Sequence, residues 1–208
     1  MTSWIVLQLA DSAFPTGGFA HSGGLEAHVQ AGELASLETY CREYLDQLAR
    51  GSLPLAATVH DDPTRLAEVD AFARATLWNH VAARASRAQG RALLDVAARS
   101  FDVAKPTGIE GHLAPAFGYV TRALGVERDE ALATFLHLGL RGLLSAAVRL
   151  GCAGPSEAQS LHLHLHSALA AALARGRALG LADVAQPSPL SELIQGTHDR
   201  LYSRLFQS

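Results

Sequence analysis

Hydrophobic positions recur along the chain every three or four residues, which is the spacing of one face of an α-helix. Runs of alternating β-branched residues, the pattern typical of a strand, do not occur. The sequence therefore predicts an all-α fold, a single-domain bundle of roughly eight to ten helices spanning residues 1–208. The predicted helical segments are residues 3–13, 25–32, 36–50, 55–60, 62–77, 81–101, 111–125, 130–150, 155–179 and 190–194.

The most apolar segment, residues 130–150, is expected to be the central helix of this bundle. Apolar residues surround it on nearly every side. Gly139 and Gly142 each cost a helix about 1 kcal/mol relative to alanine, so we expect a neighbouring helix to cross closely there. Polar residues interrupt the apolar run, which favours a buried helix over a membrane span: His137, Arg141 and Arg149.

The stretch between the first two helical segments, residues 14–26, contains four glycines and one proline. Glycine pairs such as Gly17-Gly18 and Gly23-Gly24 are needed where the backbone takes a positive φ or approaches another surface closely. A loop that only connects two helices needs fewer of them. We therefore expect this loop to have a role beyond connection.

The loop does not have the sequence of a nucleotide-binding site. It lacks the G-K-[ST] of a phosphate-binding loop, and an all-α fold removes the strand on which phosphate and dinucleotide loops depend. A nucleophilic triad from Asp11, His21 and Ser22 is also unfavourable, because adjacent Ser and His side chains cannot easily hydrogen-bond each other. We expect no catalytic residues and no cofactor.

Composition and charge narrow the possible functions further. With 49% hydrophobic and 18% charged residues, the chain is expected to be globular. Its net charge of −3 argues against nucleic acid as the main ligand, since phosphate binding requires a concentrated basic face. Cys41 and Cys152 lack the spacing of a metal site and are expected to be reduced thiols. Without a recognisable secretory signal, a cytoplasmic location is expected.

Three alternating histidines at first suggest a metal site: His162, His164 and His166. On a helix only His162 and His166 share a face, because positions i and i+4 do so. Two histidines without a nearby carboxylate or thiolate make an incomplete site. A solvated helix face is the favoured interpretation, and a metal-binding carrier is the alternative.

Two further stretches could contact another protein. Arg84, Arg87 and Arg91 follow helical spacing, and they form either a solvated face or an anchor for an acidic partner. Residues 197–208 combine arginine with apolar side chains, the composition of interface hot spots. These apolar side chains would be exposed unless they dock, either on a partner or on the chain's own core: Leu201, Tyr202, Leu205 and Phe206.

The two ends of the chain together resemble one known family. L-Q-L-A-D at residues 7–11 and P-T-G-G-F-A-H-S-G-G-L-E at residues 15–26 resemble the N-terminal signature of the urease accessory protein UreF. H-D-R-L-Y-S-R-L-F-Q-S at residues 198–208 is similar to that family's H-E-x-Q-Y-S-R-L-F-R-S terminus. Internal segments also fit, so the resemblance spans nearly the whole chain: residues 89–91, 111–118 and 148–150.

The resemblance implies an all-α, cytoplasmic, non-enzymatic co-chaperone. UreF-like proteins form a complex with UreD (also called UreH) and the GTPase UreG, which helps to load nickel into apo-urease. The resemblance also implies a homodimer within that complex, and a histidine-based nickel-binding carrier remains the alternative. By position, a tail at residues 197–208 would face UreD through Tyr202, Arg204, Leu205 and Phe206, and Arg149 would face UreG. The loop would contact a partner or a second protomer through Gly17, Gly18, Phe19 and His21.

Overall fold

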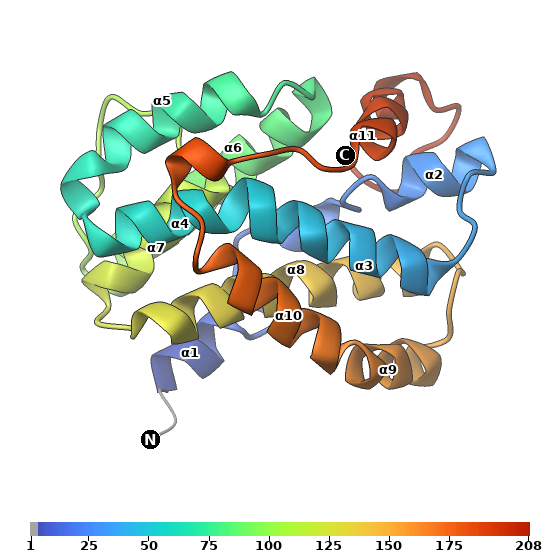
Figure 1. The fold of residues 1–208 in the computed structure, drawn as a ribbon, viewed down its shortest axis with the longest axis horizontal. Helices are drawn as coiled ribbons and strands as arrows, with labels where there is room; N and C mark the ends of the chain where they lie inside the picture. The colour runs from blue at the N-terminus through green and yellow to red at the C-terminus, as the bar shows by residue number, and fades with distance from the viewer. Residues whose placement is uncertain (1–3) are drawn as a thin grey trace.

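The computed structural model describes residues 4–208, which form α-helices and short turns without a strand. This confirms the all-α prediction (Figure 1). The predicted start of the first helix at Ser3 lies outside the described residues. The helices are α1 (Trp4–Leu9), α2 (Leu25–Ala31), α3 (Leu37–Gln47), α4 (Leu53–Asp61), α5 (Leu66–Thr76), α6 (His80–Ser100), α7 (Leu113–Ala123), α8 (Arg128–Arg149), α9 (Pro155–His164), α10 (His166–Gly176) and α11 (Pro189–Gly196).

The helix α8 lies in the middle of the bundle and contacts α1, α2, α3, α4, α7, α9 and α10. Its leucines Leu132, Leu136 and Leu140 are at most 1% exposed, and each buried leucine contributes about 1.5–3 kcal/mol. By length and composition alone α8 could cross a membrane, but 56% of its most apolar window is buried in the bundle. The prediction of a central buried helix is therefore confirmed.

The two glycines of α8 have different surroundings. A Cβ atom at Gly139 would lie 2.5 Å from Cδ1 of Leu48, so the predicted close approach is confirmed at this position. At Gly142 no atom lies within 4 Å of such a Cβ, so the prediction is wrong there. Gly142 instead lines a cavity beside α8.

Two predicted helix boundaries also differ from the structure. The segment predicted as one helix over residues 155–179 is two helices, α9 and α10, which meet at the buried Leu165. Between α3 and α4 the chain continues through a turn of π-helix, Leu48–Ser52, and Pro54 follows within the first turn of α4. Proline has no N–H to donate, and the carbonyl of Arg50, four residues earlier, accepts the N–H of Ala185 at 3.2 Å instead.

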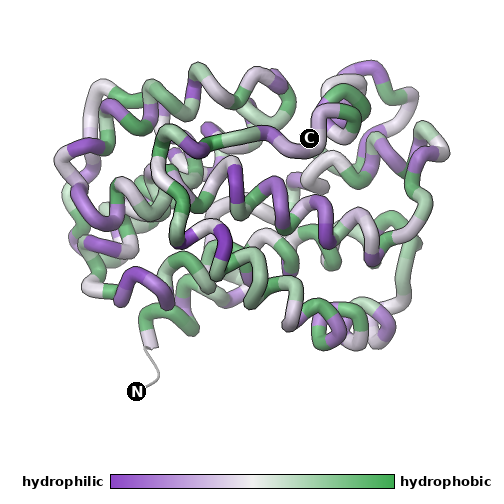
Figure 2. The backbone as a smooth tube through the Cα atoms, viewed as in Figure 1, coloured by the Kyte–Doolittle hydropathy of each residue, from purple (hydrophilic) through white to green (hydrophobic). Residues whose placement is uncertain are grey.

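Hydrophobic and hydrophilic residues alternate along much of the backbone (Figure 2), whereas α4 is buried over nearly its whole length. The chain's last residues do not continue away from the bundle. They return to the N-terminal half and lie near α2 and α11 (Figure 1). The two ends that carry the sequence motifs are therefore neighbours in space.

Candidate functional site

The glycine-rich loop adopts a backbone that only glycine tolerates well. Gly17, Gly23 and Gly24 have φ values of 73°, 62° and 88°, in the left-handed region that disfavours side chains. A Cβ atom at Gly24 would also lie 2.9 Å from the hydroxyl oxygen of Tyr40. Both expected reasons for the glycines, positive φ and close approach, are therefore confirmed at Gly24.

The end of the chain is hydrogen-bonded along this loop. The N–H of Gln207 donates to the carbonyl of Ala20 at 2.8 Å, and the N–H of Ser22 donates to the backbone oxygen of Ser208 at 2.7 Å. The Ser22 hydroxyl donates to the same oxygen at 2.9 Å, and the Ser208 hydroxyl lies 2.7 Å from Nδ1 of His21. Ser22 and His21 are therefore engaged by the tail rather than by each other. We call residues 14–26 together with residues 198–208 the loop–tail surface.

Glu26 is the buried carboxylate that fastens the tail. It is 1% exposed, and its Oε1 accepts the N–H of Leu205 at 2.6 Å. Its Oε2 accepts the N–H of Phe206 at 3.2 Å and lies 3.0 Å from Nε2 of the fully buried His198. Hydrogen bonds to a charged group contribute about 1.5–3 kcal/mol each. Sequence reasoning assigned Glu26 no role, although a carboxylate inside a short apolar helix is a signal that it has one.

Arg149 connects the end of α8 to both parts of this surface. Its guanidinium lies 4.2 Å from the centre of the Phe206 ring, a cation–π contact. It donates hydrogen bonds to the carbonyls of Phe19 and, at 3.4 Å, of Leu205. The structure thus brings together three groups that the sequence analysis treated separately: the loop, Arg149 and the tail.

The tail docks on its own chain and still presents apolar groups outward. Phe206 is 5% exposed and packs in the core. Tyr202 and Leu205 are 103% and 61% exposed, and Phe19 of the loop is 75% exposed. Packing on the chain's own core is therefore confirmed for Phe206, whereas docking of Tyr202 and Leu205 on a partner stays a prediction. Exposed apolar groups gathered at one place are typical of interaction sites.

Asp199 ties the tail to α6. Its carboxylate lies 2.7 Å from Arg84, 3.1 Å from His80 and 3.6 Å from Arg204. The hydrogen bond from Arg84 is the main reason why the pKa of Asp199 falls to about 2. The carboxylate therefore stays ionised and holds one cation of the tail and two groups of α6.

The arginine stripe of α6 is largely occupied within the chain. Arg84 is paired with Asp199, and a guanidinium nitrogen of Arg87 lies 3.5 Å from the carboxylate of Glu110. Arg91 donates to the backbone carbonyl of Glu110 at 2.7 Å. These contacts leave less unpaired charge for the predicted anchor, and they also differ from the alternative of a simply solvated face, because the three arginines bind groups of their own chain.

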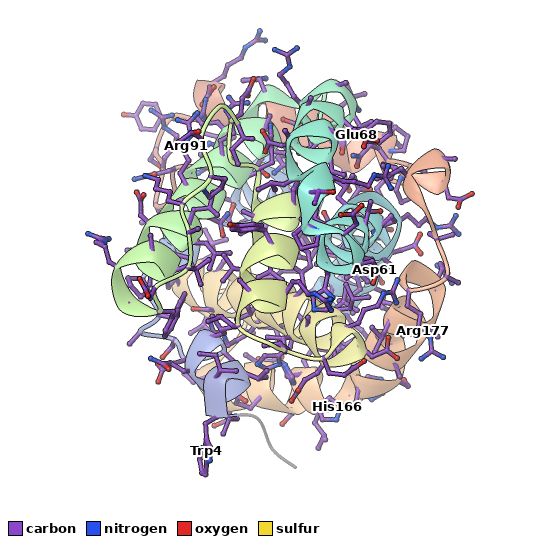
Figure 3. The ribbon with its side chains drawn as sticks, turned by 90° about the vertical axis from the view of Figure 1, so that its left-hand side faces the viewer. Trp4, Asp61, Glu68, Arg91, His166 and Arg177 are labelled. Carbon is purple, nitrogen blue, oxygen red and sulfur yellow. The ribbon has the colours of Figure 1, made fainter. Side chains whose placement is uncertain are left out.

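His162 of α9 and His166 of α10 lie beside a third histidine, His137, which the sequence analysis did not place with them. The ring of His162 is 5.3 Å from that of His137 on α8 and 5.5 Å from that of His166. His166 lies at the surface (Figure 3), and His164 points elsewhere, 3.4 Å from Glu38. Burial, followed by the neighbouring rings, lowers the pKa of His137 and His162. Among residues 4–208, no three His, Cys, Asp or Glu side chains are placed to hold a metal ion.

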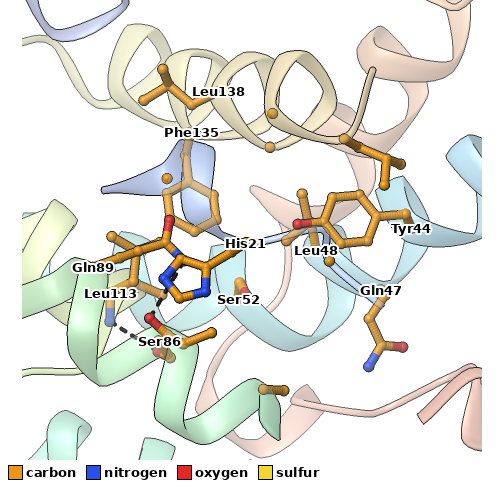
Figure 4. Close-up of a pocket in the computed structure, with 18 of the residues that line it drawn as sticks. His21, Tyr44, Gln47, Leu48, Ser52, Ser86, Gln89, Leu113, Phe135 and Leu138 are labelled. Atoms are coloured by element: carbon orange, nitrogen blue, oxygen red, sulfur yellow. Dashed lines mark hydrogen bonds between the residues drawn. The ribbon is translucent and has the colours of Figure 1, made fainter. Parts of the chain in front are cut away.

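A cavity of about 410 Å³ lies behind the loop, between α3, α6 and α8 (Figure 4). Phe135 and Leu48 contribute to its apolar wall, while His21, Tyr44 and Gln89 contribute polar groups. Burial raises the pKa of Tyr44 to about 12 and lowers the pKa of His21. Both pKa shifts favour the neutral forms of these two groups, while charged residues such as Asp11, Glu43 and Arg141 also line the cavity.

Fold and site together define an all-α bundle whose distinctive feature is a surface built from both ends of its chain. Residues 33–166 match the family model described as UreF. Over 99% of its length the chain is 36% identical to Urease accessory protein F of Arabidopsis thaliana, of which 92% is covered. It is 32% identical to Urease accessory protein UreF of Arthrobacter sp. (strain FB24), covering 97% of this chain and 95% of that protein. It is also 32% identical to the protein of the same name from Rhizobium leguminosarum bv. viciae, covering 100% of this chain and 95% of that protein. The chain belongs to the UreF family.

Proposed function

We propose that this chain is a non-enzymatic co-chaperone of urease maturation in the cytoplasm. It binds UreD/UreH through the loop–tail surface and positions the GTPase UreG for nickel insertion into apo-urease, as a homodimer within the complex. The relatives named urease accessory protein support the role in maturation. The observation that carries the proposal is the convergence of both end motifs and Arg149 on one surface.

This surface has the physical properties of a protein-binding site. Tyr202, Leu205 and Phe19 are exposed, while Glu26 and Arg149 hold the backbone of Leu205 and Phe19 in place. Groups held in place before binding lose little conformational entropy on association. Aromatic and arginine side chains at the centre of an interface carry most of its binding energy.

The proposed contacts differ among the predicted residues. Tyr202, Leu205 and Arg204 are exposed and would touch UreD/UreH directly, whereas Phe206 is buried and would support them. The loop, including Gly17 and Gly18, would present Phe19. His21 faces Ser208 and would set the position of the tail. Arg149 borders the same surface, so its proposed contact with UreG would lie next to the UreD/UreH contact.

The test is the affinity of a purified UreD/UreH homologue for single-residue variants. We expect Tyr202→Ala to weaken binding by more than about 1 kcal/mol without changing the unfolding temperature. Phe206→Ala should weaken binding and also lower the free energy of unfolding by about 3–5 kcal/mol. Leu163→Ala, on the exposed face of α9, is the matched control and should change neither. Unchanged affinity of both tail variants would refute the proposal.

Co-purification tests the assembly as a whole. The full chain should retain the UreD/UreH and UreG homologues, whereas a chain without residues 198–208 should retain neither. A truncated chain that is folded and still retains UreD/UreH would show that the tail is not the docking segment.

A further inference from the structure

The loop–tail surface and its border together carry more arginines than carboxylates, although the whole chain carries a net charge of −3. Four arginines belong to it or border it: Arg84, Arg149, Arg200 and Arg204. The carboxylates that contact this region are Asp199, which Arg84 and Arg204 share, and Glu26, which is buried against His198. The surface therefore has more exposed cations than anions.

Two of these arginines have no carboxylate within ion-pair distance in the part of the chain that the structure describes. Arg149 makes its contacts with the carbonyls of Phe19 and Leu205 and with the Phe206 ring. Arg200, in the turn His198–Arg200, is exposed and forms no ion pair among residues 4–208. Carbonyl oxygens and an aromatic ring satisfy a guanidinium only in part, because they carry no full negative charge.

The cations border an apolar centre. Leu205 follows Arg204 in the sequence, and its carbonyl accepts a hydrogen bond from the Arg149 guanidinium. Tyr202 stands two residues from Arg200 and two from Arg204 along the tail. An apolar centre with a charged rim is the usual arrangement of a protein interface. Complementary charge at such a rim guides the encounter and excludes wrong partners.

We propose that the partner of this surface presents an apolar socket for Tyr202 and Leu205, bordered by carboxylates that pair with Arg200 and Arg204. Arg204 can take part because its contact with Asp199 is 3.6 Å long, and that carboxylate is shared with Arg84. This inference rests on the proposed function, in which that partner is UreD/UreH. An acidic protein fits better than a nucleic acid for two reasons. The centre of the surface is aliphatic as well as aromatic, and the face of the Arg149 guanidinium is covered by Phe206.

The test measures the affinity of a purified UreD/UreH homologue for the full chain while the NaCl concentration of the assay is raised from 50 to 500 mM. Arg200→Gln and Arg204→Gln should each weaken binding about 2- to 5-fold at low salt, mainly through a slower association rate. The double variant should show a smaller loss of affinity with salt than the unmodified chain. Arg122→Gln is the matched control, because Arg122 is exposed on α7 and unpaired among the described residues.

The outcomes separate this inference from the proposed function. Strong binding that neither salt nor the two substitutions change would overturn the acidic rim and leave the proposed function intact. Failure of UreD/UreH to bind the unmodified chain at any salt would overturn both. A single-stranded oligonucleotide that binds as tightly as UreD/UreH, and loses affinity in the same two variants, would replace the acidic protein with a nucleic acid.

Discussion

The loop–tail surface and the histidine cluster are built in opposite ways. Glu26 and Leu205 are 179 positions apart, yet their hydrogen bond is 2.6 Å long. Both carboxylate oxygens of Glu26 have partners, whereas Nδ1 of the neighbouring His198 is buried without one. The histidines of the cluster include two that lie close in sequence. Their rings contact mainly each other, and Nε2 of His162 is buried without a partner.

This difference shows that closeness in sequence does not make a site. A site that holds one geometry needs partners for its polar groups, because an unpartnered buried group costs free energy and a paired one fixes a conformation. The loop–tail surface meets this condition more fully than the histidine cluster. Glu26 has three partners, although Nδ1 of His198 is buried without one, whereas no side-chain hydrogen bond to the His162 ring occurs among the described residues. The first should therefore be sensitive to substitution, and the second to pH.

The largest effect is expected for Glu26→Ala. This substitution leaves His198 and the N–H groups of Leu205 and Phe206 buried without their acceptor. Removal of one partner from such a group lowers the free energy of unfolding by about 3–5 kcal/mol, measured by urea denaturation. Gln30→Ala, which removes a hydrogen bond to Ser203 at the exposed side of the tail, should cost less than about 1 kcal/mol. Equal losses in the two variants would show that the buried carboxylate has no special role.

The next largest effect is expected for glycine substitutions in the loop, where backbone strain at a positive φ can be compared with strain plus a close contact. Gly17→Ala places a side chain at positive φ in open space and should cost about 1 kcal/mol. Gly24→Ala adds a contact with Tyr40 and should cost about 1–3 kcal/mol in total. Thermal unfolding of both variants measures the difference. If Gly24→Ala is no worse than Gly17→Ala, the close approach of Tyr40 does not constrain the loop.

A smaller effect is expected from pH at the histidine cluster. Because the pKa of His162 is lowered in the folded state, the unfolded state binds more protons below a pH of about 6.5. Stability should therefore fall as the pH drops from 7.5 to 5.5. His162→Gln should reduce this fall by less than about 1 kcal/mol after allowance for solvent screening. Urea midpoints at both pH values provide the measurement, and an unchanged fall would mean that His162 does not contribute.

The smallest expected effect concerns nickel. Because the cluster lacks an assembled set of ligands in the described residues, we expect no near-stoichiometric micromolar binding in equilibrium dialysis of the isolated chain. The double variant His162→Gln/His166→Gln is the control. Binding that the unmodified chain shows and the double variant loses would favour the alternative of a histidine-based nickel carrier.

Features that depend on local pattern could be predicted from the sequence. The bounds of α8 agree within two residues with the prediction of residues 130–150, because a long apolar run identifies a buried helix by itself. The left-handed backbone at Gly23 and Gly24 follows from the glycine pair in the same way. Both features are fixed by residues that are neighbours in the chain.

Features that depend on distant contacts could not be predicted in this way. Apolar spacing continues through Leu165, so nothing local indicates the break between α9 and α10. The placement of His137 beside His162 depends on how α8 packs against α9. The role of Glu26 requires the tail as its partner, and only the fold brings the two together.

The distance along the chain between Glu26 and its partners has a consequence for protein synthesis. The ribosome makes the loop first and residues 198–208 some 170 positions later, as the 172-residue separation of Glu26 and His198 shows. Before residues 198–208 are made, the loop cannot form its hydrogen bonds to the tail, while the helices that lie between loop and tail in the sequence can already pack. A chain that stalls or is cut before residue 198 therefore lacks the tail half of the loop–tail surface. Only molecules that contain both segments can then offer the proposed docking surface to a partner.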